Sequence, residues 1–203
     1  MADDMYVIDD EGDIIFVVGP TKKKLKVSSA TLSKVSPVFK ALLGPHFRDG
    51  QAKRTAQDPA TICLPDDQPV LMGRLCELAH LSDVPAGIIG GDSTTSENLL
   101  GFAVMVDKYD MAGRLRLQCQ AMLLNWLRTD ARPSAQDLPS TALGNIIAAA
   151  YILKQHEVFE TATLRFMRRA YARTSPLLAS QCGQKLPVEV LCECTLRVEI
   201  GCT

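Results

Sequence analysis

The sequence carries almost no net charge, because 22 lysines and arginines face 23 aspartates and glutamates, for a formal net charge of −1. No global field would draw such a chain onto nucleic acid or an anionic membrane. The sequence also lacks a hydrophobic run approaching the roughly 20 residues that cross a bilayer. Its acidic start, MADDMYVIDDEGD, has no basic region of the kind that begins a secretory signal. We therefore expect a soluble intracellular protein, in the cytoplasm or nucleus, that does not act at a membrane.

Histidines are few, and the common catalytic motifs are missing. The 3 histidines, His46, His80 and His156, are far apart, and no His-Glu-x-x-His pattern occurs. GPTKKK at 19–24 lacks the spacing of a phosphate-binding loop, and there is no Gly-x-Ser-x-Gly elbow. A catalytic set gathered from distant positions is left open by the sequence. We expect no enzyme, no small-molecule substrate and no cofactor.

The sequence contains 7 cysteines, an odd number, which without an export signal we expect to be mostly free thiols. Those with apolar neighbours are expected in the core. The others crowd the C-terminal end with the spacing C-x9-C-x-C-x7-C. Thiolates there could hold a structural zinc, but paired C-x2-C units and a nearby histidine are missing, so we expect no metal. The expected core cysteines are Cys63, Cys76 and Cys119; the C-terminal ones are Cys182, Cys192, Cys194 and Cys202.

Short apolar runs predict a small sheet. GDIIFVVGP at 12–20 is typical of a buried strand, and KKLKVS at 23–28 alternates as a half-exposed strand does. The residues Gly-Pro-Thr-Lys between them predict a hairpin. TICLP at 61–65 is expected to form a third strand. MYVI at 5–8 could pair at an edge of the sheet.

Elsewhere the apolar residues recur at helical spacing. Two short helices are expected within 28–43, with Ser29 and Ser36 as their caps. Asp66 or Asp67 is expected to cap the next helix. Further helices are expected at 69–81, 99–112, 114–127, 141–155 and 157–172, with Gly113 as the left-handed residue between the second and the third.

This order of elements excludes a doubly wound nucleotide-binding sheet, because too few strands are present. It predicts an α+β fold in which a small β-sheet is capped by a cluster of α-helices and followed by an α-helical extension. We place the first domain at 1–130 and the helical extension at 131–203. Within the extension, 186–203 is ambiguous between helix and strand.

The triplet Asp107-Lys108-Tyr109 lies beside the apolar face of an expected helix. It could be an acid–base pair with a phenol. We favour a structural role, because adjacent residues on a helix point in different directions. On this interpretation Tyr109 buries its ring and gives its hydroxyl to a backbone partner.

Taken together, these segments resemble the BTB/POZ domain, in the form common in fungal proteins. GDIIFVVG is similar to the family's first strand, and LKVSSATLSKVSPVFKALL to its strand followed by the L-x-x-x-S-P-V-F helix. ICLPDDQPVLMGRLCELAHL is similar to the third strand and the helix after it, and AVMVDKYDM to the D-K-Y helix. The resemblance covers 12–127. Residues 134–203 resemble part of the helical, BACK-like extension that often follows.

The resemblance implies a protein–protein interaction module without an active site. Family members commonly form homodimers, and many are substrate adaptors for cullin-RING ubiquitin ligases. In the adaptors a hydrophobic-x-Glu motif, in the loop after the S-P-V-F helix, contacts the cullin. The corresponding residues here are Phe47, Arg48 and Asp49, where Asp replaces Glu and has a shorter reach. The expected partners are proteins: a second copy, a cullin and ligase substrates.

Apolar side chains exposed at helix starts and in loops mark interaction sites. On that basis Leu32, Val35 and Phe39 are self-association candidates, although each could instead belong to the core, Phe39 above all. Strongly dimeric family members carry a swapped helix before the first core strand, and no leading helix fits here. We therefore expect self-association to be weak or absent.

A different class of function would use RFMRRAYAR, which places Arg165, Arg168, Arg169 and Arg173 near one another. As a phosphate-binding patch, these arginines would make the chain a chromatin- or nucleic-acid-associated factor. Alternatively they are cations at the end of a helix, where they offset its dipole. We favour the second interpretation, because no comparable cluster occurs on a neighbouring helix.

Overall fold

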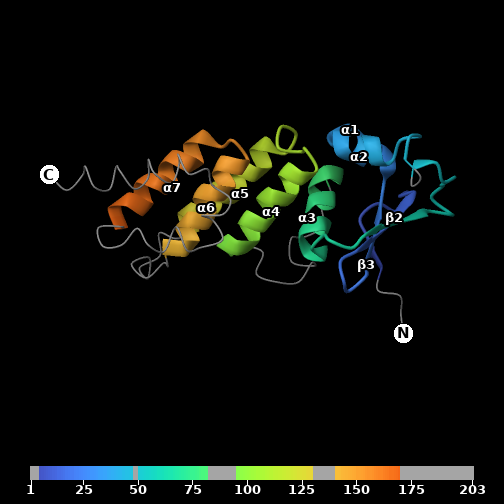
Figure 1. Cartoon of the computed structure of the whole chain (residues 1–203), viewed down its shortest axis with the longest axis horizontal. Helices are drawn as coiled ribbons and strands as arrows, with labels where there is room; N and C mark the ends of the chain where they lie inside the picture. Colours follow the sequence, from blue (N-terminus) through green and yellow to red (C-terminus); the bar gives the residue numbers. More distant parts are fainter. Residues whose placement is uncertain (1–4, 48–49, 82–94, 130–139, 170–203) are drawn as a thin grey trace. The chain divides into compact units, whose positions relative to one another are not determined.

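The fold combines a four-stranded β-sheet with seven α-helices among the residues described, which confirms the predicted α+β class (Figure 1). No helix in that part of the chain has the length and apolar character needed to cross a membrane. The computed structural model describes residues 5–47, 50–81, 95–129 and 140–169.

The chain divides into two compact units. Unit 1 comprises 1–91 and 105–115, and unit 2 comprises 92–104 and 116–203. Each unit thus combines two separate ranges of the sequence, because the division follows contacts in the folded chain. The expected domain boundary at residue 130 stays a prediction.

The sheet of unit 1 has the strand order β1-β3-β2-β4. β2 and β3 form the predicted antiparallel hairpin, while β4 pairs parallel with β2 and β1 pairs parallel with β3. Because β2 is paired on both sides, even its outward residues are only partly exposed. This confirms the buried strand, the half-exposed strand and the edge position of the first strand. The strands are β1 (Met5–Val7), β2 (Ile14–Val18), β3 (Lys23–Val27) and β4 (Ala60–Leu64).

Gly19 begins the hairpin turn. Its φ of +65° lies in the left-handed region, which glycine adopts without steric cost. A Cβ at this position would also lie 2.8 Å from the carbonyl oxygen of Asp67. The close approach of the turn to the loop after β4 therefore requires glycine.

Unit 1 carries the helices α1 (Ser29–Val35), α2 (Pro37–Leu42) and α3 (Pro69–His80). Ser36 caps α2 as predicted, since its hydroxyl accepts a hydrogen bond from the Phe39 amide at 3.0 Å. The prediction of Ser29 as the cap of α1 was wrong. Ser28 has the extended backbone of a cap and accepts from Thr31, because the helix begins one residue earlier than expected.

Gln68, and neither of the expected aspartates, caps α3. Its side-chain oxygen accepts from the amide of Leu71 at 2.6 Å. The prediction of Asp66 or Asp67 was wrong because the chain enters the helix later, directly before Pro69. Asp67 is therefore available for a different contact.

α4 (Ser96–Lys108) contributes residues to both units. The left-handed residue after it is Asp110, with φ +49°, and not Gly113 as expected. The Met111 amide bonds to Val106 and the Asp110 amide to Asp107, both at 2.9 Å, which satisfies carbonyls left open at the helix end. The left-handed residue therefore lies where the hydrogen bonds of the helix end, at Asp110, and not at the nearest glycine.

The core of unit 1 lies between the sheet and its helices, and is formed by fully or nearly fully buried apolar side chains. They include Ile14, Phe16, Val18, Leu25, Val27, Leu32, Phe39, Leu43, Ile62, Met72, Leu75 and Tyr109.

Unit 2 contains α5 (Arg116–Thr129), α6 (Ser140–Ile152) and α7 (His156–Arg169). α7 packs against both α5 and α6 (Figure 1). Every residue from 142 to 150 is buried, so this part of α6 is covered on all sides. Its polar exception, Asn145, donates to the Ser96 hydroxyl at 3.1 Å and is thereby satisfied.

His80 joins the end of α3 to the start of α1 and should make stability depend on pH. Its Nε2 accepts from the Ser28 amide at 3.0 Å, while Nδ1 lies 2.7 Å from the Cys76 carbonyl oxygen. A neutral ring with its proton on Nδ1 satisfies both contacts. Burial lowers the pKa of His80, although the Cys76 carbonyl and the charge of Asp9 act in the opposite direction.

The unfolded chain protonates His80 more readily than the folded chain does. We therefore expect the free energy of unfolding to be highest above about pH 6.5 and to fall below that pH. Urea denaturation from pH 7.5 to 5.5 measures this loss, and His80→Gln should reduce it. An identical pH dependence in the variant would show that the effect does not come from His80.

Candidate functional site

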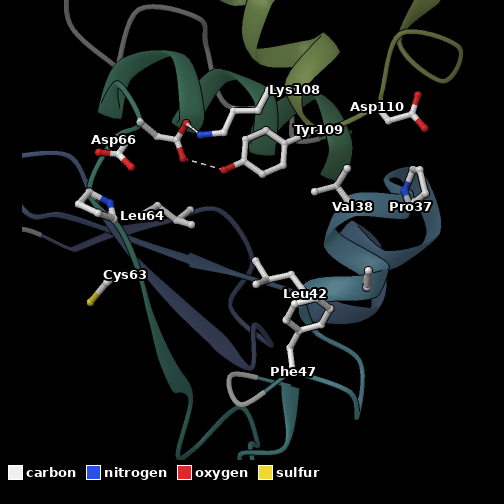
Figure 2. Close-up of a pocket in the computed structure, with 13 residues that line it drawn as sticks. Pro37, Val38, Leu42, Phe47, Cys63, Leu64, Asp66, Lys108, Tyr109 and Asp110 are labelled. Carbon is white, nitrogen blue, oxygen red and sulfur yellow. Dashed lines mark hydrogen bonds and ion pairs between the residues drawn. The ribbon is translucent and has the colours of Figure 1, made fainter.

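An open groove of about 680 Å³ lies on unit 1 (Figure 2). Its walls are α2, the following loop, the end of β4 with the loop after it, and the end of α4. Most of the lining is apolar, and charged side chains gather at one end. The lining residues are Pro37, Val38, Ala41, Leu42, Phe47, Cys63, Leu64, Pro65, Asp66, Asp67, Lys108, Tyr109 and Asp110.

Two buried contacts hold α2 against the end of α4. The Ser36 hydroxyl, which caps α2, also donates to the Tyr109 carbonyl oxygen at 2.6 Å. The Phe39 ring stacks on the Tyr109 ring with a centroid distance of 4.3 Å, and on Phe16 at 5.5 Å. The bond between Ser36 and Tyr109 joins residues 73 positions apart, and with the Phe39–Tyr109 stack it places two walls of the groove relative to each other.

Asp67 organises the charged end of the groove. Its carboxylate accepts from the Tyr109 hydroxyl and from Lys108 Nζ, each at 2.7 Å (Figure 2). The Asp67 side chain is only 4% exposed, whereas that of Lys108 is 49% exposed. Both oxygens of a buried carboxylate are thus satisfied, and the loop after β4 is tied to α4.

The predicted triplet Asp107-Lys108-Tyr109 therefore lies partly in the groove. The expected backbone partner for the Tyr109 hydroxyl was wrong, because the partner is the Asp67 carboxylate. Burial raises the pKa of Tyr109, and the Asp67 carboxylate raises it further. At neutral pH the phenol accordingly stays protonated and acts as a hydrogen-bond donor. The Asp67 contact could not be read from the triplet, since Asp67 lies 42 positions away.

Phe47, the first cullin-contact candidate, is 51% exposed and lines the groove. In Figure 2 Phe47 and Leu42 lie at the end opposite Lys108 and Tyr109. Asp49, the second candidate, lies outside the described residues. Among the residues described, the exposed carboxylates that line the groove are Asp66 and Asp110.

The self-association candidates are placed differently from one another. Leu32 and Phe39 are fully buried within unit 1. This confirms the core position favoured for Phe39, whereas an exposed position for Leu32 was wrong. Leu32 faces the core from α1, and Phe39 is held between Phe16 and Tyr109. Val35 is partly exposed at the end of α1.

Among the basic-patch residues, only Arg165 has a described side chain. It donates through Nη1 to the carbonyl of Leu127, in the last turn of α5. This contact satisfies a carbonyl at a helix end, which is a structural use of the cation. The side chains of Arg168, Arg169 and Arg173 lie outside the described residues.

The described cysteines are free thiols. Cys76 and Cys119 are buried as predicted, and burial raises the pKa of Cys119 to about 11. The prediction of a core position for Cys63 was wrong: it is exposed, because Ile62 is the residue of this strand that faces the core. The C-terminal cysteines, with the zinc alternative, lie outside the described residues. Within the described ones, no cluster of His, Cys, Asp or Glu side chains is suited to hold a metal ion.

No family model matches the sequence, and no curated protein matches it.

Proposed function

We propose that this chain is a BTB/POZ-like protein-interaction module that binds a cullin through the groove on unit 1, and so serves as a substrate adaptor. The single observation that carries the proposal is the exposed ring of Phe47 at an apolar groove. Aromatic side chains in this position commonly anchor protein interfaces. The occupant implied by the resemblance is a cullin.

The arrangement of elements supports the same proposal. The segments that carry the resemblance form the strands and helices it implies: β2, β3, the pair α1–α2, β4, α3 and α4. The S-P-V-F segment contributes Ser36 as a cap, Phe39 to the core and Val38 to the groove. The D-K-Y segment meets it through Tyr109. The sequence motifs are therefore joined in one structural unit.

Phe47→Ala tests the proposal. An aromatic hot-spot residue contributes about 2 kcal/mol to binding, so the variant should weaken capture of a cullin about thirtyfold. The measurement is affinity purification of the tagged chain from native lysate, with quantification of cullin and RING subunits by mass spectrometry. Asp49→Lys, at the other motif position, should weaken capture as well.

Leu117→Ala is the matched control, because Leu117 is an equally apolar side chain, 74% exposed on α5 in unit 2. It should leave capture unchanged. A cullin captured equally by the wild-type chain and by Phe47→Ala would contradict the groove assignment. Capture of other proteins without a cullin would favour the self-associating scaffold.

The nucleic-acid alternative receives less support. The described arginine of its patch, Arg165, is already engaged at the end of α5. The near-zero net charge gives the chain no global field that would draw it onto nucleic acid.

A further inference from the structure

A second hollow, of about 580 Å³, lies on unit 1 and is lined by charged side chains. The end of α1, the start of α2 and the turn after α4 form its walls. It shares Pro37 and Asp110 with the groove, so the two depressions adjoin. The other lining residues are Ser33, Lys34, Val35, Lys40, Gly113 and Arg114.

Positive charge dominates this hollow. Lys34, Lys40 and Arg114 are all exposed, and Asp110 is the sole carboxylate in the lining. None of the cations forms an ion pair with another described residue. A local excess of cations in a chain with a formal net charge of −1 is a specific feature of this surface.

The walls of the hollow are held in place by the core. The hydrogen bond from Ser36 to the Tyr109 carbonyl joins α2 to the end of α4, immediately before Asp110. A Cβ at Gly113 would meet no atom within 4 Å, so this side of the hollow is open. Walls that are fixed before binding reduce the entropy lost on binding.

We propose that this basic hollow binds an acidic segment of a partner protein. Complementary charge would attract such a segment and set its position on the surface. Val35 and Pro37 provide apolar contacts for its side chains. None of the lining residues, all of which are described, is aromatic, so bases would find no stacking platform, and a peptide fits better than nucleic acid.

The proposal is independent of cullin binding. Its test uses the full chain and a fluorescein-labelled peptide of alternating Asp and Glu, with fluorescence anisotropy as the measurement. The triple variant Lys34→Gln, Lys40→Gln and Arg114→Gln should weaken binding about tenfold, since each exposed ion pair contributes a small amount. Binding by the wild-type chain should weaken at salt above about 0.1 M, where the screening length falls below about 10 Å.

The control removes the same number of charges from exposed positions outside the hollow: Lys22→Gln, Lys53→Gln and Arg128→Gln. It should bind the peptide as the wild-type chain does. Melting curves of both triple variants should match that of the wild type, because every substitution is at an exposed side chain.

Several outcomes would overturn the proposal. These are equal weakening in the control, no binding by the wild-type chain at low salt, or equal binding of the same peptide with Gln and Asn in place of its acids. Tighter binding of single-stranded oligothymidine than of the peptide would instead assign the hollow to nucleic acid.

Discussion

Phe39→Ala should lower the free energy of unfolding by about 4 kcal/mol, which is typical when a buried phenylalanine is truncated. Phe39 has no exposed surface, and its ring lies between Phe16 and Tyr109. The variant loses both ring contacts and leaves a cavity at the centre of unit 1. Urea denaturation followed by far-UV circular dichroism measures the change.

Val38→Ala is the matched control. Val38 is adjacent in sequence and 38% exposed, so its truncation should change the free energy of unfolding by only about 0.5 kcal/mol. Phe39 was also a self-association candidate. A stable Phe39→Ala variant that only shifts the chain from dimer to monomer would show that Phe39 acts at an interface and not in the core.

Asp67→Ala should cost about 3 kcal/mol, the next largest expected effect. The substitution leaves the Tyr109 hydroxyl without its acceptor in a buried site. The ion pair with Lys108 contributes less, because the lysine is half exposed and screened by solvent. The same denaturation experiment measures the loss.

Asp66→Ala provides the comparison, since Asp66 is the exposed neighbour and lines the same groove. We expect a change of about 0.5 kcal/mol or less. Tyr109→Phe should cost about 1 kcal/mol, because Asp67 keeps its contact with Lys108. If Asp66→Ala and Asp67→Ala destabilised the chain equally, the hydrogen bond to Tyr109 would not be the cause.

Asp67→Ala also bears on the proposed function. Asp67 ties the loop after β4 to the end of α4, and both are walls of the groove. Loosening them should weaken partner capture even though Asp67 itself is almost fully buried. Phe47→Ala, by contrast, should weaken capture without changing the stability of the fold, because its ring is exposed.

Local patterns predicted most elements of the sheet and of the early helices. A continuous apolar run marked β2, alternation of apolar residues with lysines marked β3, and Ser36 before Pro37 marked the start of α2. These features depend on residues close together in the sequence, where side-chain period and cap chemistry act directly. The predicted exposure of Leu32 failed because a local pattern does not say which apolar residues other elements cover.

The errors at Ser29, Asp67 and Gly113 have a common physical cause. Several neighbouring residues were chemically able to cap or end each helix, and the alternatives differ by small free energies. Long-range contacts decided among them: Ser29 donates to Asp13, and Asp67 accepts from Tyr109. The helix before Gly113 ends at Asp110, where the chain closes its hydrogen bonds.

By itself, the sequence determined the α+β class, the hairpin, the central strand and the cap of α2, because hydrophobic period and capping are local. Only the tertiary structure decided that Phe47, Asp67 and Tyr109 line one groove. It likewise brought Lys34, Lys40 and Arg114 around one hollow. These residues come from distant segments, and the buried contacts of Ser36 and Phe39 with Tyr109 bring the segments together. Their position therefore depends on how the core packs.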